Sequence, residues 1–183
     1  MSLFQNFTNA DIWSNGKGSS KFDRREKTRH YRRAGGACIE IYTDGGCSGN
    51  PGPGGWAYVI IKDGVLFAEK WGAEKLTTNN RMELQAVIAA LEFLASGKNM
   101  EEKITIFTDS QYVQKGITLW LAEWKKRGWK TSDKKPVKNQ DLWQRLEPLA
   151  EQFLVNWVWV KGHAGNKYNE RCDELTRTAI VSL

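Results

Sequence analysis

The sequence predicts an α/β fold in which a mixed five-stranded sheet carries helices on both faces. In the first half of the chain, three strand-like runs are joined by connections too short to cross the sheet, which favours antiparallel pairing. In the second half, strand-like and helical runs alternate, which favours parallel strands with helical crossovers. A length of 183 residues with 40% apolar composition suits one core of ordinary size.

The antiparallel part is predicted to be a meander followed by a helix. Residues 38–43 form its first strand, and the glycine- and proline-rich residues 45–55 are expected to turn the chain. The next two strands, residues 56–62 and 65–71, are joined by an Asp-Gly turn. A helix of about four turns follows residues 77–80. Its apolar face is predicted to consist of Leu84, Val87, Ile88, Leu91 and Leu94.

The second half is predicted to alternate strands and helices. The elements expected in order are a strand at 103–107, a short helix from Ser110, helices at 118–127 and 139–151, a strand at 153–160 and a last helix at 167–181. A nucleotide-binding glycine fingerprint is excluded, because the glycine-rich stretch leads into another strand and not into a helix N-terminus.

Composition excludes several classes of protein. The longest apolar runs, residues 56–61 and 86–91, are far shorter than the ~20 residues that cross a bilayer. Cys38, Cys47 and Cys172 are scattered and odd in number, so neither a disulfide framework nor a zinc site is indicated. We expect a cytoplasmic protein with reduced thiols, monomeric and without an obligatory protein partner.

Positive charge is concentrated in two segments of a chain whose net charge is +6. Residues 1–37 carry eight Lys and Arg against three acidic residues, and residues 124–138 carry seven against one. The remainder is mildly acidic. This outline is typical of a nucleic-acid enzyme whose site needs carboxylates.

The first segment, residues 1–37, shows no helical or strand period and is predicted to be a flexible, basic N-terminal extension of a catalytic domain at 38–183. Three roles remain open for it: a tether for nucleic acid, a leader without function, or an organelle presequence, against which its acidic residues argue.

Acidic side chains are expected to gather at one edge of the sheet. Asp44 ends the first predicted strand and Asp109 ends the fourth, so they are neighbours if those strands pair in parallel. A helix that starts at the same edge brings Glu83 alongside. Crowded carboxylates repel one another unless cations neutralise them, and hard oxygen ligands suit Mg²⁺ or Mn²⁺. Two such ions about 3.5–4 Å apart can activate water and stabilise the leaving oxygen of a phosphodiester.

Each carboxylate also has an ordinary structural explanation. Asp44 precedes two glycines and could be a turn residue, and Asp109 could cap the helix that follows it. Asn80 and Glu83 have the spacing of a capping box. Asp173 lies in a run of mixed charge and could belong to a solvated helix face.

Five motifs lie in order between residues 38 and 181. They are TDGGCSGNPGPGG at 43–55, NNRME at 79–83, TDSQYV at 108–113, VKGHAGN at 160–166 and NERCD at 169–173. Together they resemble ribonuclease H type 1 of the bacterial kind. The resemblance implies an RNase H-like fold, with a sheet of strand order 3-2-1-4-5 whose first three strands are antiparallel.

The resemblance also implies an activity: an endonuclease that cuts the RNA strand of RNA–DNA hybrids and leaves 5′-phosphate and 3′-hydroxyl ends. The family's cofactor is a pair of Mg²⁺ ions, with Mn²⁺ as the alternative. By position, Asp44 would bind both ions and Asp173 would complete the nucleophile-side ion. Glu83 and Asp109 would complete the leaving-group-side ion. His163 matches a mobile histidine that assists proton transfer or product release.

Recognition of the hybrid is also implied by matching positions. The residues that would read 2′-hydroxyls are Cys47, Asn79, Asn80 and Gln111, and those that would hold the DNA strand near a phosphate are Asn50 and Thr78. The residues that match the family's basic protrusion are Trp120, Trp124, Lys125, Lys126, Arg127, Trp129 and Lys130. The alternative is that Trp120, Trp124 and Trp143 are core residues and the lysines a solvated face; we expect a mixture.

Two other functions must be weighed. A hybrid-binding module without catalysis could keep the fold, but the presence of four carboxylates and His163 argues against it. A DNA-cutting relative of the same fold would share the carboxylates but should lack Gln111 and the set at residues 47–50.

Overall fold

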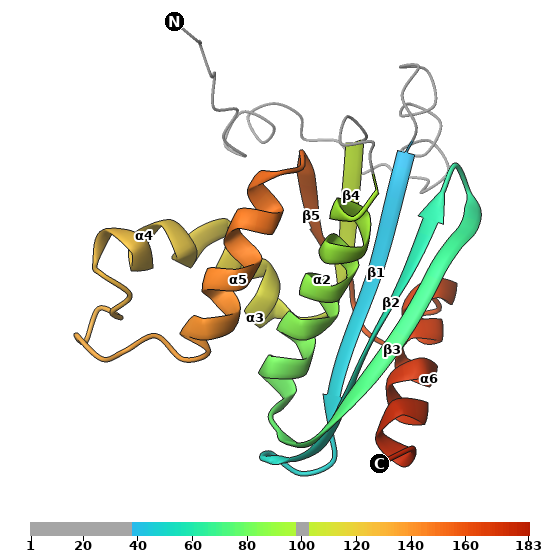
Figure 1. The fold of residues 1–183 in the computed structure, drawn as a ribbon, viewed down its shortest axis with the longest axis horizontal. Coiled ribbons are helices and arrows are strands. Elements are labelled where there is room, and N and C mark those ends of the chain that lie inside the picture. The colour runs from blue at the N-terminus through green and yellow to red at the C-terminus, as the bar shows by residue number, and fades with distance from the viewer. Residues whose placement is uncertain (1–37, 98–102) are drawn as a thin grey trace, which may run out of the picture. The chain divides into compact units, whose positions relative to one another are not determined.

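The sheet has five strands in the order β3-β2-β1-β4-β5. The computed structural model describes residues 38–97 and 103–183, so the predicted extension at 1–37 lies outside the described residues. The strands are β1 (Cys38–Cys47), β2 (Gly52–Lys62), β3 (Val65–Thr77), β4 (Lys103–Thr108) and β5 (Val155–Trp159). The first three are antiparallel, and β4 is parallel to both β1 and β5, as the sequence predicted (Figure 1).

The first three strands are longer than predicted. The turn predicted at residues 45–55 is confined to residues 48–51, because β1 continues to Cys47 and β2 begins at Gly52. Within this stretch Gly46 pairs with Gly55. The glycines serve close packing here: a Cβ on Gly55 would lie 2.6 Å from the backbone oxygen of Thr176 in the last helix. Glycine density therefore marks strand positions beneath a helix as well as a turn.

Helices cover both faces of the sheet. The helices α2 (Asn79–Ala95) and α5 (Gln140–Glu151) lie on one face, and α6 (Lys167–Val181) lies on the other (Figure 1). The bounds of α6 are those predicted. In the predicted apolar stripe of α2, Leu94 is only partly buried. The other members of that stripe, Leu84, Val87, Ile88 and Leu91, are fully buried.

Strand β2 shows why the core needs both layers. Its side chains alternate between the faces, with Tyr58 and Ile60 in the core cluster under α2 and Val59 and Ile61 in the cluster under α6. All four are at most 1% exposed. Full burial of such side chains stabilises the fold by roughly 1.5–3 kcal/mol each. The strand that neighbours the carboxylate-bearing β1 is thus fixed from both sides.

The segment after β4 is a nearly continuous helical run. It consists of α3 (Gln111–Lys115), the π-helical turn η2 (Gly116–Trp120) and α4 (Leu121–Lys126), so the expectation of two separate helices is wrong. Gly116 sits against the ring of Trp143 in α5, where no Cβ would fit. Among residues 38–97 and 103–183, no helix combines the length and apolar character that crossing a membrane requires.

Candidate active site

Asp44 and Asp109 meet where β1 and β4 stop pairing. The last parallel pair is Thr43 with Thr108, and the two aspartates are the residues that follow. The prediction that Asp44 ends its strand is wrong, because β1 continues beside β2 to Cys47. The turn explanation for Asp44 is therefore wrong. Nor does Asp109 cap α3, because the side chain of Ser110 accepts the hydrogen bond from the Val113 amide.

Glu83 is brought to the same place by the start of α2. Gly45 lies directly against the backbone of Glu83, at a distance that leaves no room for a Cβ. The capping-box explanation is wrong, because the N-cap of α2 is Thr78 and makes no side-chain capping bond. Glu83 is instead 6% exposed, and its Oε2 has no hydrogen-bond partner.

These three side chains form a compact acidic cluster. Asp44, Glu83 and Asp109 each offer a carboxylate oxygen, and these atoms all lie within 4.8 Å of one another. Burial, and then the neighbouring Asp109 and Asp173, raise the pKa of Asp44 to about 6, although the Thr176 hydroxyl opposes this. Burial and the charges of the other two aspartates raise the pKa of Glu83 well above its usual value. A divalent cation would reverse this destabilisation of the charged forms.

The donor set fits a hard divalent cation. It contains carboxylate oxygens only, and one of them, Glu83 Oε2, is buried without any protein donor. A buried acceptor without a donor costs stability unless something positive satisfies it. Oxygen-only sites suit Mg²⁺ or Mn²⁺ better than zinc or copper. The three carboxylates thus have the composition and the spacing to hold a hard divalent cation.

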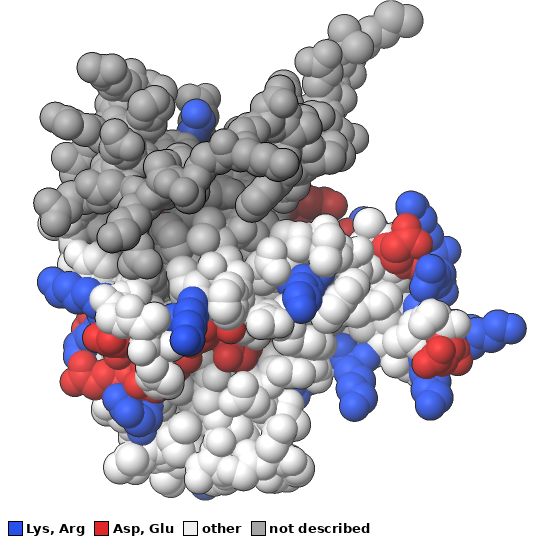
Figure 2. Space-filling view, turned by 180° about the vertical axis from the view of Figure 1, so that it is seen from behind, with Lys and Arg blue, Asp and Glu red and all other residues white. Residues whose placement is uncertain are grey.

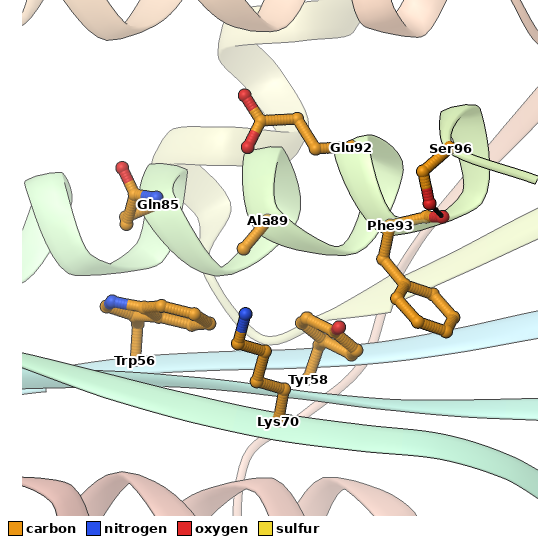
Figure 3. Close-up of a pocket in the computed structure, with 8 residues that line it drawn as sticks. All are labelled: Trp56, Tyr58, Lys70, Gln85, Ala89, Glu92, Phe93 and Ser96. Atoms are coloured by element: carbon orange, nitrogen blue, oxygen red, sulfur yellow. Dashed lines mark hydrogen bonds between the residues drawn. The ribbon is translucent and has the colours of Figure 1, made fainter.

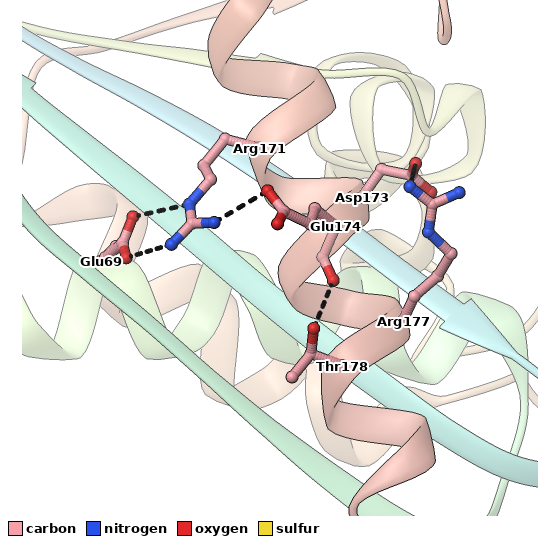
Figure 4. A network of polar contacts seen from close by, with 6 residues as sticks. All are labelled: Glu69, Arg171, Asp173, Glu174, Arg177 and Thr178. Carbon is pink, nitrogen blue, oxygen red and sulfur yellow. Dashed lines mark hydrogen bonds and ion pairs between the residues drawn. The ribbon is translucent and has the colours of Figure 1, made fainter.

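Asp173 is not a member of this group of three. It lies on α6, with 24% of its side chain exposed, and its Oδ2 is 2.9 Å from Arg177 Nη2 (Figure 4). It is near enough to Asp44 to contribute to that residue's raised pKa. Of the four predicted ligands, the structure therefore brings three together and holds the fourth beside them in an ion pair.

A second arginine on α6 contacts the sheet. Arg171 donates to both carboxylate oxygens of Glu69 in β3, at 3.1 and 2.7 Å, and also to Glu174 (Figure 4). Bidentate pairs of this kind fix orientation as well as contributing energy. This contact joins β3 to the helix that carries Asp173.

His163 is exposed in the turn between β5 and α6, with a positive φ of 52°. Its charge lowers the pKa of Asp44, so it lies within electrostatic reach of the cluster. Neighbouring Gly162 approaches the cluster directly: a Cβ there would be 2.7 Å from Asp109 Oδ2. The turn that the motif resemblance singled out thus lies beside the carboxylates.

The predicted hybrid-reading residues gather at the same end of the sheet. Cys47 donates through its thiol to the carbonyl oxygens of Gly52 and Thr77, at 3.2 and 3.4 Å. Asn50 accepts a hydrogen bond from the Asn79 amide at 3.2 Å, which ties the β1–β2 loop to α2. The remaining members also lie at helix starts: Thr78 and Asn80 at α2, and exposed Gln111 at α3.

The predicted basic protrusion combines packed aromatic rings with exposed cations. Trp124 packs on Trp120 and on the fully buried Trp143, with ring centroids 5.7 and 5.5 Å apart. Trp129 is partly buried against the same core. The charges that project from α4 and the loop after it are visible on the right in Figure 2. The expected mixture of packed tryptophans and outward cations is therefore found.

Several of these cations are already paired. Lys125 pairs with Glu147, and both Lys126 and Arg127 pair with Glu123. In the described part of the chain, no ion pair involves Lys130. The two pairs with the exposed Glu123 contribute little to stability, so Lys126 and Arg127 can exchange them for phosphate contacts.

A groove away from the cluster does not resemble a catalytic site. It lies between β2, β3 and α2 (Figure 3). Its one carboxylate, Glu92, is bound by Arg145. Trp56, Tyr58 and Phe93 supply its aromatic walls.

Three contacts on Asp109 were not predicted from the sequence. They come from Trp159, Gly162 and Asn169, of which the last two were noted only as parts of motifs. The available signal was the four-residue spacing from Asn169 to Asp173, which places both on one side of a helix.

Comparison with known proteins identifies the family. The RNase H family model matches residues 37–181. A ribonuclease H of Treponema denticola is 56% identical over 157 residues, covering 79% of this chain and 98% of that protein. A ribonuclease H of Aromatoleum aromaticum is 57% identical over 145 residues, covering 79% of this chain and 92% of that protein.

Solved structures agree with the sequence relatives. LC9-RNase H1, described as a type 1 RNase H with the type 2 active-site motif, superposes with a TM-score of 0.72 at 33% identity, covering 80% of this chain and 74% of that one. LC11-RNase H1, solved in complex with an RNA/DNA hybrid, has a TM-score of 0.61 at 27% identity, covering 79% and 97%. The chain therefore belongs to the RNase H family, as a type 1 ribonuclease H.

Proposed function

We propose that this enzyme hydrolyses the RNA strand of RNA–DNA hybrids with two Mg²⁺ ions, giving 5′-phosphate and 3′-hydroxyl ends. The observation that carries the proposal is the cluster of Asp44, the buried Glu83 and Asp109, whose carboxylate oxygens lie within 4.8 Å of one another, in a chain of this family. A hybrid substrate is supported by the complex of the similar LC11-RNase H1 with RNA/DNA. Mn²⁺ is the alternative ion.

The protein's own residues have separate tasks in this proposal. Asp44 would hold both ions, Glu83 and Asp109 would complete the leaving-group side, and Asp173 the nucleophile side. When bound, the ions supply an activated water and neutralise charge on the phosphodiester. His163, exposed in its turn beside the cluster, would accept or return a proton.

Discrimination of RNA from DNA would come from the polar edge around the cluster. Cys47, Asn79, Asn80 and Gln111 would contact 2′-hydroxyls in the wide minor groove of the hybrid. Asn50 and Thr78 would hold the DNA strand near a phosphate. The protrusion would attract further phosphates of that strand through Lys125, Lys126, Arg127 and Lys130, with Trp120, Trp124 and Trp129 as its packed support and sugar contacts.

A strand-specific cleavage assay tests this function. Hybrids labelled on either strand are incubated with the protein and Mg²⁺, beside duplex DNA and duplex RNA. Only the RNA strand of the hybrid is expected to be cut, and Asp44→Asn and Glu83→Gln are expected to abolish cutting. The matched control is Glu92→Gln, because Glu92 lies on the same helix as Glu83 but pairs with Arg145. Cleavage of duplex DNA, or full activity in Asp44→Asn, would contradict the proposal.

We propose that residues 1–37 form a basic tether for the hybrid, attached to the catalytic domain at 38–183. The support is the concentration of eight Lys and Arg in this segment. Removing residues 1–36 should then reduce the dependence of hybrid affinity on salt, because fewer phosphate contacts release fewer counterions. An unchanged salt slope would favour the leader without function.

We also propose that the enzyme is a cytoplasmic monomer. Cys47 and Cys172 are free thiols, which suits a reducing compartment. Light scattering after size exclusion should give the mass of one chain, and cell fractionation should place the protein with cytoplasmic markers.

A further inference from the structure

Asn169 makes a buried contact with one carboxylate of the acidic cluster. It lies in the first turn of α6, is only 2% exposed, and its Nδ2 donates to Asp109 Oδ2 at 3.4 Å. The position of this turn is set locally, because the Asn166 side chain caps α6 by accepting from the Asn169 amide at 3.4 Å. The side-chain amide of Asn169 is thus carried by the first turn of α6 and not by a flexible loop.

Two further contacts restrict Asp109 from the same direction. The indole Nε1 of Trp159 donates to the Asp109 backbone carbonyl at 3.0 Å. Gly162 passes so close that a Cβ would lie 2.7 Å from Asp109 Oδ2. The backbone and one carboxylate oxygen of Asp109 are therefore both enclosed by the end of β5, the following turn and α6.

The buried side chain of Asn169 lowers the stability of the fold. Its Oδ1 is buried without a hydrogen-bond partner, so half of its amide is desolvated without compensation. An apolar side chain of similar shape would remove that cost. The neighbouring buried positions Cys172 and Leu175 are occupied by such side chains, packed against β1 and β2. Stability therefore does not account for an asparagine here, whereas its bond to Asp109 does.

We infer that Asn169 is a positioning residue, which orients the carboxylate of Asp109 for metal binding. This rests on the proposed metal-dependent function. By holding Oδ2, the amide limits the rotation of the Asp109 side chain within the cluster. Residues that orient metal ligands in this way typically contribute 10- to 100-fold, roughly, to metal affinity or activity.

The test is calorimetric titration of the full chain with Mg²⁺, together with thermal unfolding. Asn169→Leu keeps the shape of the side chain but removes the donor, and Asn169→Ala removes both. Leu175→Ala is the matched control, because Leu175 lies on the same helix and is 6% exposed but packs in the apolar cluster under α6. We expect both Asn169 variants to bind Mg²⁺ about 10-fold more weakly. Leu175→Ala should lower Tm while leaving Mg²⁺ affinity within about twofold, since it removes packing alone.

Activity against Mg²⁺ concentration gives a second readout. The Asn169 variants should need about 10-fold more Mg²⁺ for half-maximal cleavage, and excess Mg²⁺ should restore most of their rate. Unchanged Mg²⁺ affinity in both variants would overturn the inference, as would a loss that simply follows Tm as in Leu175→Ala. If the unsubstituted protein binds no Mg²⁺, the proposed metal function fails instead, so the two failures are distinguishable.

Discussion

The cluster of Asp44, Glu83 and Asp109 and the nearby Asp173 differ in how the fold holds them. The three cluster residues are placed by backbone: the end of the β1–β4 pairing and the contact of Gly45 with the start of α2. Asp173 projects from a helix surface and is held by Arg177, whose own side chain is 68% exposed.

This difference separates a preformed part of the site from an adjustable one. Gathering three carboxylates costs electrostatic energy, which the raised pKa values of Asp44 and Glu83 record. That cost is met by the rest of the fold before any ion binds, so the cluster needs little rearrangement. Asp173 can exchange its arginine for another cation at small cost, because exposed ion pairs contribute only about 0–1 kcal/mol.

Substitution within the cluster should have the largest effect on activity. Asp44→Asn removes a ligand proposed to bind both ions, and loss of several kcal/mol of charge stabilisation corresponds to a rate reduced by about 10³-fold or more. Asp173→Asn should cost less, about 10- to 100-fold, because the cluster still binds metal. Single-turnover cleavage of a hybrid at saturating Mg²⁺ measures both. Equal losses would remove the distinction between preformed and adjustable ligands.

The substitution Asp44→Asn should also stabilise the metal-free protein at neutral pH. The pKa of Asp44 is about 6 in the folded state against 3.8 ordinarily, so the folded protein binds more protons than the unfolded one between those values. The stability of the unsubstituted protein therefore falls as pH rises through this window. In EDTA at pH 7, Asp44→Asn should be more stable by about 1–3 kcal/mol, and near pH 4 the difference should largely vanish.

Urea unfolding at both pH values measures this difference. Glu83 acts in the same direction, since its pKa is also raised. Added Mg²⁺ should stabilise the unsubstituted protein selectively. A variant less stable than the unsubstituted protein at pH 7 would show that the cluster is not under electrostatic strain.

Release of Asp173 from its ion pair should have the smallest effect. Arg177→Gln removes the partner of Asp173, so Mg²⁺ affinity should rise, but by no more than about fivefold, the range of an exposed pair. Calorimetric titration measures it, with Arg171→Gln as a control that breaks a pair with Glu69 away from the cluster. If Arg177→Gln, but not Arg171→Gln, binds Mg²⁺ more weakly, then Arg177 holds Asp173 in place for the ion and does not compete with the ion for it.

The sequence by itself determined the order of the strands and helices, and it singled out the carboxylates. Those inferences rest on local periodicity and on motifs, which each segment carries independently of its neighbours. Even so, the predicted extent of the turn at residues 45–55 was wrong. The sequence does not distinguish glycines that form a turn from glycines in a strand packed under a helix.

Tertiary structure alone decided how each carboxylate is held. The contact of Gly45 with Glu83 joins a strand to a helix 38 residues further along the chain, and that of Asn169 with Asp109 spans 60 residues. Such contacts depend on how close two elements approach, a distance set by all the side chains packed between them. Local sequence patterns do not specify that distance. The carboxylate cluster could therefore be predicted from the sequence, but the groups that orient its members could not.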